Sequence, residues 1–101
     1  MFVYNISMKV APDIESAWLT WQQEEHIPEV MSSGAFTNHR FYKLLEQDES
    51  EGLTYVVQYF AETAADYELY IKEFAPGLRE KALEKWGNKF IAFRTLMQVV
   101  N

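Results

Sequence analysis

Three polar residues have the strand parity that would place them on one face of a β-sheet: Asn5, Gln58 and Arg94. A guanidinium beside two side-chain amides can bind a carboxylate or a carbonyl group, because it presents a rigid fork of donors and the amides add further hydrogen-bonding groups. The same groups could instead bond one another, as a polar network that fixes the register between two subunits. Arg40 and Tyr42 join the cluster if their strand has the parity of Phe36. The sequence leaves open whether the cluster binds a small carboxylate or carbonyl ligand or is structural.

His26 is the other candidate for chemistry. It lies near the expected end of a helix, beside Glu24 and Glu25, where the helix dipole and the carboxylates favour the protonated imidazole. In that form it could act as a general acid or as an anchor for an anion. The alternative is a structural residue that bonds the last carbonyl groups of the helix. His39 lies on an expected strand without a partner motif, so we interpret it as structural.

No metal or cofactor site is expected. Glu24, Glu25 and Glu29 flank His26, but no second histidine stands three or four residues away. The chain has no cysteine, which excludes thiolate-bound zinc, iron–sulfur clusters and disulfides. Phosphate-binding loops, dinucleotide fingerprints and the Ser-x-x-Lys and Gly-x-Ser-x-Gly motifs are absent. The expectation is therefore a protein without cofactors.

Length and composition indicate one ordered domain over residues 1–101. The 101 residues are 49% hydrophobic and 16% aromatic, with four Gly and three Pro, which is unlike a disordered chain. The net charge of −6 and the lack of a basic stripe argue against nucleic acid as a partner. No apolar stretch is long enough for a membrane span, and the first residues do not resemble a signal peptide. We expect no membrane association and a cytoplasmic location.

Polarity patterns and turn residues predict the elements that must position these side chains. Apolar residues that recur every three or four positions predict a helix from about residue 14. This helix should end or kink near His26 and Ile27, because Pro28 cannot donate an amide hydrogen. A second helix, capped by Thr63 and Asp66, extends to Gly87 and is split at Pro76. Alternating polarity predicts strands over residues 2–10, 36–45, 53–60 and about 89–100.

The order β-α-β-β-α-β is typical of the split βαβ, ferredoxin-like fold, an α+β sandwich with two helices on one face of a four-stranded antiparallel sheet. The usual strand order is 4-1-3-2. Parity then assigns an aromatic and aliphatic set to the helix-covered face: Tyr4, Ile6, Met8, Tyr55, Val57, Tyr59, Ile91, Phe93 and Met97. The opposite face receives Val3, Asn5, Ser7, Val56, Gln58, Phe60, Ala92, Arg94 and Leu96. That second set is too apolar for open water, which indicates a homodimer interface.

Several motifs resemble a known family. They are Trp18-x-x-Trp21, His26-Ile-Pro28-x-Val30, Gly34-x-Phe36, Tyr55-Val-Val-Gln58-Tyr59 and Ala92-Phe-Arg94-Thr95. Over nearly the whole chain, the pattern is similar to an uncharacterised bacterial family of the dimeric α/β-barrel superfamily. The resemblance implies that two sheets face each other across a dimer to form a barrel, as in the antibiotic-biosynthesis-type monooxygenases.

The resemblance implies no activity. The superfamily includes cofactor-free oxygenases, haem-degrading enzymes, isomerases and proteins without a known reaction. Haem-degrading members resemble this chain loosely at Asn5, but they also need a histidine on the second helix, and residues 64–86 contain none. Haem degradation is therefore not expected.

Two functions from different classes remain. The first is a non-catalytic dimeric module that binds a small ligand or a protein. The second is a small cofactor-independent enzyme, of oxygenase or isomerase type, that uses a cleft between helices and sheet. We favour the first, because no nucleophile or base with an orienting partner stands out. Whether the protein is an enzyme is left open.

Overall fold

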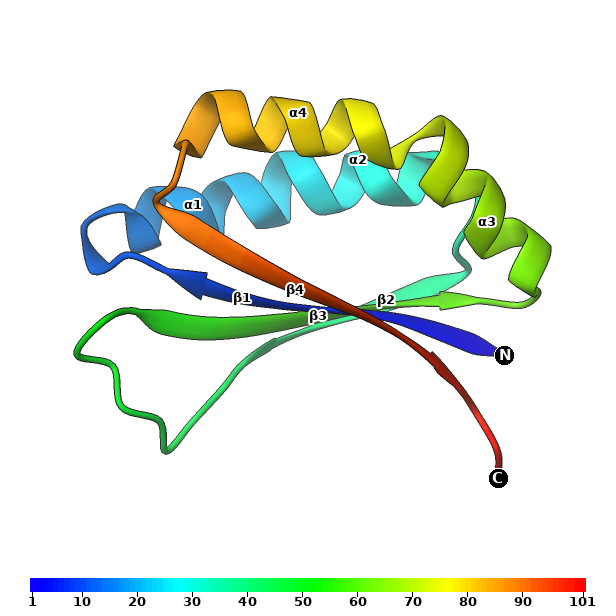
Figure 1. Cartoon of the computed structure of the whole chain (residues 1–101), viewed down its shortest axis with the longest axis horizontal. Helices are drawn as coiled ribbons and strands as arrows, with labels where there is room; N and C mark the ends of the chain where they lie inside the picture. Colours follow the sequence, from blue (N-terminus) through cyan, green and yellow to red (C-terminus); the bar gives the residue numbers. More distant parts are fainter.

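The computed structural model of the chain describes residues 1–101 and contains one four-stranded antiparallel sheet with all helices on one side (Figure 1). The sheet has the order β2-β3-β1-β4, which is the expected order. This architecture confirms the α+β, ferredoxin-like class. The strands are β1 (Phe2–Val10), β2 (Asn38–Lys43), β3 (Leu53–Ala61) and β4 (Phe90–Gln98).

The first helical segment is continuous but changes its winding. A 3₁₀ turn (Pro12–Ile14) leads into α1 (Glu15–Trp21), a π-helical stretch (Gln22–His26) and α2 (Ile27–Ser32). Pro28 has no amide hydrogen for the carbonyl of Glu24, and the turn before it widens so that the Ile27 amide donates to the Gln22 carbonyl. The predicted break near His26 is therefore a widened turn rather than an end.

The second helical segment begins and divides where the sequence predicts. Thr63 caps α3 (Ala64–Glu73), since its hydroxyl accepts from the Asp66 amide at 3.1 Å. Pro76 lies in the first turn of α4 (Ala75–Trp86), where a missing amide hydrogen costs little. Figure 1 shows α2 and α4 lying side by side over the sheet, with α3 at the end near both termini.

The core lies between the helices and the alternate residues of β1 and β3. Tyr4 pairs with Tyr59, and Ile6 with Val57, all four of them buried under the helices. Trp18 of α1 is completely buried and its ring lies 5.3 Å from that of Tyr55. The predicted helix-covered face is confirmed for these two strands.

For β4 the predicted face is wrong. Arg94 pairs with Ile6 and Ala92 with Met8, so Ala92, Arg94 and Leu96 share the helix-covered side. The more apolar set, Ile91, Phe93 and Met97, lies on the uncovered side instead. The prediction placed the more apolar set of residues toward the core. That rule fails for this edge strand, because its more apolar side faces away from the helices.

The β2–β3 connection is a long acidic loop that ends at a buried glycine. Gly52 has a φ of +148°, and a Cβ there would lie 2.7 Å from the Val10 carbonyl oxygen. Only glycine fits this close approach of the loop to the end of β1. The strand before the loop is correspondingly shorter than predicted, ending at Lys43.

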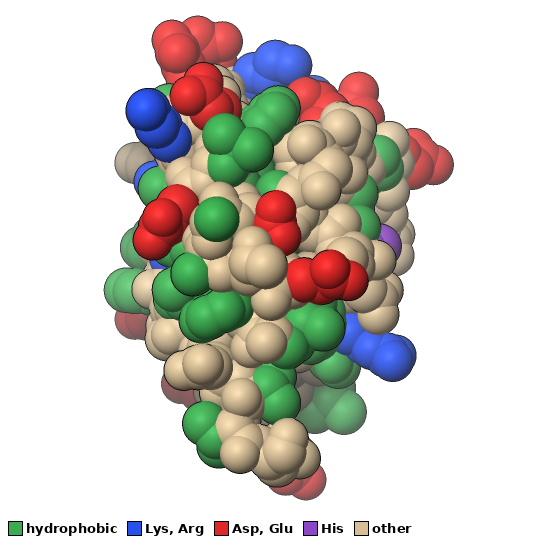
Figure 2. Space-filling model, turned by 90° about the vertical axis from the view of Figure 1, so that its right-hand side faces the viewer, with side chains coloured by type: hydrophobic (Ala, Val, Ile, Leu, Met, Phe, Trp, Pro, Cys, Tyr) green, Lys and Arg blue, Asp and Glu red, His purple; other side chains and the backbone are tan.

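Charged and apolar side chains divide between the two layers. Figure 2 views the end of the molecule that carries α3 and both termini, with most acidic side chains over the helical layer and hydrophobic ones more frequent on the sheet side. None of the helices combines the length and apolar character that crossing a membrane would require.

Candidate functional site

A row of polar side chains crosses the uncovered face of the sheet. The register aligns Arg40, Gln58, Asn5 and Thr95 on successive strands. Gln58 Nε2 donates to Asn5 Oδ1 at 3.2 Å, and the Tyr42 hydroxyl donates to Gln58 Oε1 at 3.5 Å. Arg40 and Tyr42 therefore join the predicted cluster with Asn5 and Gln58.

Arg94 does not belong to that row. Its pairing with Ile6 places it on the helix-covered side, so the expected convergence of Arg94 with Asn5 and Gln58 is wrong. The amides of the row bond each other without it. The apolar surroundings of the row are exposed in the single chain, with Phe93 at 65% and Ile91 at 58%.

A cleft lies on the other face of the sheet, between α4 and β4. Its inner cavity measures about 30 Å³ and reaches Met8, Trp21, Gln22 and His26. Its outer part measures about 230 Å³ and opens at the sheet edge. The two parts share five lining residues, and so form one continuous cleft: Arg79, Ala82, Phe90, Ala92 and Arg94.

Gln22 supplies an unpaired acceptor at the inner end of the cleft. The side chain is 1% exposed, and its Nε2 lies 3.6 Å from the Met8 sulfur, a weak acceptor. Its Oε1 has no hydrogen-bond partner. Since a buried acceptor without a partner costs roughly 1 to 3 kcal/mol, this oxygen is ready to bind a donor. Sequence reasoning missed Gln22, although it stands four residues after Trp18, on the core-facing stripe.

His26 lines the same cavity as a neutral imidazole. Its ring stacks on Trp21, with ring centroids 4.7 Å apart. Burial lowers the pKa of His26 to about 4, with Glu29 acting to raise it and Arg94 to lower it further. The expectation that His26 is protonated is therefore wrong near neutral pH. Desolvation of the imidazole outweighs the effect of the carboxylates that the sequence places beside it.

Two arginines stand where the inner and outer parts of the cleft meet. Arg79 Nη2 donates to the Tyr4 hydroxyl at 3.0 Å, which positions its guanidinium. Arg94 forms no hydrogen bond or ion pair, and no carboxylate side chain lines either part of the cleft. Sequence reasoning missed Arg79 as well. The available signal was a charged residue on the inward stripe of α4, between Ala75 and Ala82.

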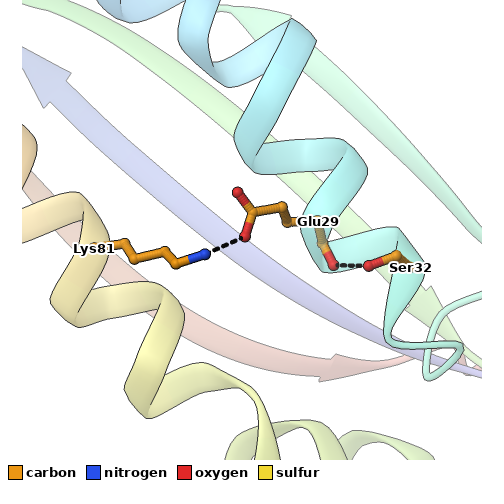
Figure 3. Close-up of polar contacts among 3 residues, drawn as sticks. All are labelled: Glu29, Ser32 and Lys81. Carbon is orange, nitrogen blue, oxygen red and sulfur yellow. Dashed lines mark hydrogen bonds and ion pairs between the residues drawn. The ribbon is translucent and has the colours of Figure 1, made fainter.

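An exposed ion pair connects the two helices above the cleft. Lys81 Nζ of α4 lies 3.0 Å from Glu29 Oε2 of α2, and the Glu29 carbonyl accepts from the Ser32 hydroxyl at 2.7 Å (Figure 3). Both charged side chains are substantially exposed, so the pair contributes at most about 1 kcal/mol. The same Glu29 carboxylate acts to raise the pKa of His26.

The remaining candidates stand apart from the cleft. His39 lies on the edge strand β2, exposed, with its ring 6.4 Å from that of Tyr59. No group of three or more His, Cys, Asp or Glu side chains is arranged as a set of metal ligands. The structure thus brings together His26 and Arg94 on one face, and Asn5, Arg40 and Gln58 on the other.

A family model described as "Domain of unknown function (DUF4286)" matches residues 1–100. No curated protein matches the chain. The expected resemblance to an uncharacterised ferredoxin-like family is confirmed.

Solved structures share the fold at low sequence identity. An ethyl tert-butyl ether d (ethd) family protein from Bacillus halodurans is 12% identical, with a TM-score of 0.70 over 99% of this chain and 100% of that one. SnoaB, a cofactor-independent oxygenase from Streptomyces nogalater, is 9% identical, with a TM-score of 0.68 over 99% and 93%. A dimeric ferredoxin-like protein from an uncultured marine organism is 18% identical, with a TM-score of 0.65 over 100% and 96%. At these identities the likeness establishes the fold alone.

Proposed function

The chain belongs to the DUF4286 family, and from that premise we propose that it is a cytoplasmic, single-domain homodimer that binds a small organic molecule in the cleft between α4 and β4. The observation that carries the proposal is the unpaired Gln22 Oε1 at the inner end of a cleft with a mostly apolar lining. Ligand sites are typically concave, mostly apolar and equipped with a few convergent polar groups. This cleft has that composition.

The homodimer is supported by the uncovered sheet face. Phe93 and Ile91 of β4 are more than half exposed in the single chain and share the uncovered face with Val56 and Phe60 of β3, with β1 between the two strands. An apolar surface of this kind is usually covered by a partner. Solved neighbours that share the fold are described as dimeric ferredoxin-like proteins. The polar row of Asn5 and Gln58 would then fix how the two sheets meet.

A ligand screen with a blocked cleft tests the binding proposal. Ala92 lines both parts of the cleft, so Ala92→Leu fills space that a ligand would occupy. We expect at least one compound of a small-molecule library to raise the melting temperature of the wild-type protein, and Ala92→Leu to abolish that shift. Thr95→Val, on the other face of the same strand, is the matched control and should keep the shift. If no compound raises the melting temperature, or if Ala92→Leu responds like the wild type, the proposal is wrong.

A second candidate is a cofactor-independent enzyme of oxygenase or isomerase type. It is favoured by the neutral imidazole of His26 inside the cleft, because that nitrogen can accept a proton from a bound substrate. Arg79 and Arg94 would stabilise the resulting anion. SnoaB, whose fold is similar, is described as a cofactor-independent oxygenase.

Proton abstraction can be measured directly on the compounds that bind. An enzyme of this kind should incorporate deuterium from heavy water into a bound compound, or consume oxygen in its presence. His26→Gln should stop either reaction while keeping most of the thermal shift by the compound, because the amide oxygen of Gln can still accept a hydrogen bond but cannot act as a base. If binding compounds show neither exchange nor oxygen uptake, the non-catalytic function stands and the enzymatic one fails.

A further inference from the structure

From the distribution of polar groups along the cleft, we infer that its ligand is a small hydroxy or amino carboxylic acid. Its carboxylate lies between Arg79 and Arg94, a donor next to the carboxylate points inward and bonds Gln22 Oε1, and the apolar body extends into the outer part of the cleft. This inference rests on the proposed binding function and adds the chemical class of the ligand.

The junction of the inner and outer parts defines the position of the carboxylate. Arg79 and Arg94 both line the inner and the outer part, so their guanidinium groups flank the path into the cavity. Arg79 is held by the Tyr4 hydroxyl and Arg94 has no partner, and no carboxylate side chain lines the cleft to neutralise either. Paired guanidinium forks match the geometry of a carboxylate and bind it through charge-assisted hydrogen bonds.

The inner cavity defines the donor end. Its volume of about 30 Å³ compares with the roughly 10 to 15 Å³ that one water-sized group requires, so it admits a hydroxyl or an amino group but not a ring. Gln22 Oε1 is an acceptor without a partner, and the neighbouring His26 is a neutral imidazole whose unprotonated nitrogen also accepts. A donor is the only kind of group that satisfies both side chains.

The outer part fits the body of the ligand. Its walls are formed by Ala82, Leu83, Phe90 and Ala92, and its volume of about 230 Å³ is sufficient for a small ring or a short aliphatic chain. These apolar side chains would contact the part of the ligand that carries no polar group.

Matched trios of compounds separate the two polar contacts. Each trio contains a hydroxy acid, the same acid without its hydroxyl, and the methyl ester of the hydroxy acid. One trio is mandelate, phenylacetate and methyl mandelate, in which the hydroxyl lies next to the carboxylate and the ring can extend into the outer part, and others have aliphatic bodies. Isothermal titration calorimetry on the full chain should find at least one trio in which the hydroxy acid binds about tenfold more tightly than either relative.

Two cleft variants and one control assign each preference to a residue. Arg94→Gln should abolish the preference for acid over ester, and Gln22→Leu should abolish the preference for the hydroxylated acid over the plain one. Arg40→Gln removes a guanidinium from the uncovered face and should change neither preference. Circular dichroism of each variant shows that it is folded.

The outcomes distinguish this inference from the binding proposal. If esters bind as tightly as acids and Ala92→Leu blocks both, the cleft binds small molecules but the acidic class is wrong. If Arg40→Gln removes the preference for acids and Arg94→Gln does not, the acid binds on the uncovered face and the inference is overturned. If no member of any trio binds, the inference is wrong, while compounds of other classes still decide the binding proposal.

Discussion

The two faces of the sheet hold similar polar groups in opposite states. On the uncovered face, the side-chain amides of Asn5 and Gln58 bond each other across neighbouring strands. On the covered face, the amide of Gln22 is more deeply buried but leaves its oxygen without a partner. A network in which every polar group is hydrogen-bonded fixes the register of the strands, whereas a polar group without a partner can still form a hydrogen bond. The difference supports a structural role for one face and the proposed ligand binding for the other.

The largest expected effect contrasts aromatic side chains of the two faces. Trp18→Ala should lower the free energy of unfolding by roughly 3 to 5 kcal/mol, because it empties a site that is completely buried in the single chain. Phe93→Ala, on the uncovered face, is the comparison. Its cost should shrink on dilution, because it depends on the dimer. Urea unfolding at two protein concentrations measures both, and equal, concentration-independent losses would contradict the difference between the faces.

The next effect tests whether the uncovered face is dry in the dimer. Val56→Asp should weaken dimerisation by about 3 kcal/mol, because it buries a carboxylate without a partner at the proposed interface. Leu69→Asp, on exposed α3, adds the same charge elsewhere and should leave the dimer intact. Light scattering over a dilution series measures the equilibrium, and an unchanged dimer for Val56→Asp would refute the proposed interface.

A smaller effect concerns pH on the covered face. The folded pKa of His26, about 4, lies below the ordinary value of 6.5, so the unfolded chain binds more protons between these two values. Stability should therefore fall as the pH drops from about 6.5 to about 4, by on the order of 2 kcal/mol after allowing for partial exposure. His26→Gln should remove this part of the pH dependence. Chemical denaturation across that window measures it, and superimposable profiles would show that the imidazole is not desolvated.

The smallest expected effect has opposite signs on the two faces. Gln22→Leu should raise the free energy of unfolding by about 1 kcal/mol, because it replaces an unsatisfied buried acceptor with an apolar group of similar size. Gln58→Leu should lower it by about 1 kcal/mol, since it leaves Asn5 Oδ1 without its donor. Denaturant titrations of the two variants measure both changes in the free energy of unfolding. Destabilisation by Gln22→Leu would mean that the protein itself satisfies this amide.

The elements of the fold could be predicted because their limits are set locally. Four residues act through their own backbone or through a neighbour within one turn: Pro28, Thr63, Pro76 and Gly87. In that order, the structure has a widened turn before the first, a helix cap at the second, a division between two helices at the third and a helix end at the fourth. The order of strands then follows from the general preference for short, right-handed connections.

The faces of β4 could not be predicted, because polarity alternation identifies two faces without saying which one meets the helices. Phe93 and Ile91 form the more apolar set and face away from the core, while Arg94 faces the cleft. The rule that apolar residues point inward assumes a single buried face. A sheet whose face away from the helices is also apolar, as in this chain, removes that assumption.

The cleft residues were only partly predictable, since their state depends on burial. The sequence identifies His26 but gives the wrong protonation, because the desolvation that sets its pKa comes from packing against Trp21 and the sheet. Gln22 and Arg79 were detectable as polar residues on inward helical stripes. Their distinct roles, one unpaired and one bonded to Tyr4, appear only in three dimensions.

The widened turn before Pro28 also sets the direction in which side chains of the first helical segment point around the helix axis. In a regular helix each residue advances by about 100°, so side chains five apart point roughly 140° away from each other. The π-helical stretch holds one more residue in its turn, which brings His26 back over Trp21 and allows their rings to stack. Removing one residue between them would restore regular winding and leave the imidazole four residues after Trp21, only about 40° away from it. A single deletion here would thus keep the imidazole over Trp21, whereas regular winding at the present spacing of five residues would turn it out of the cleft.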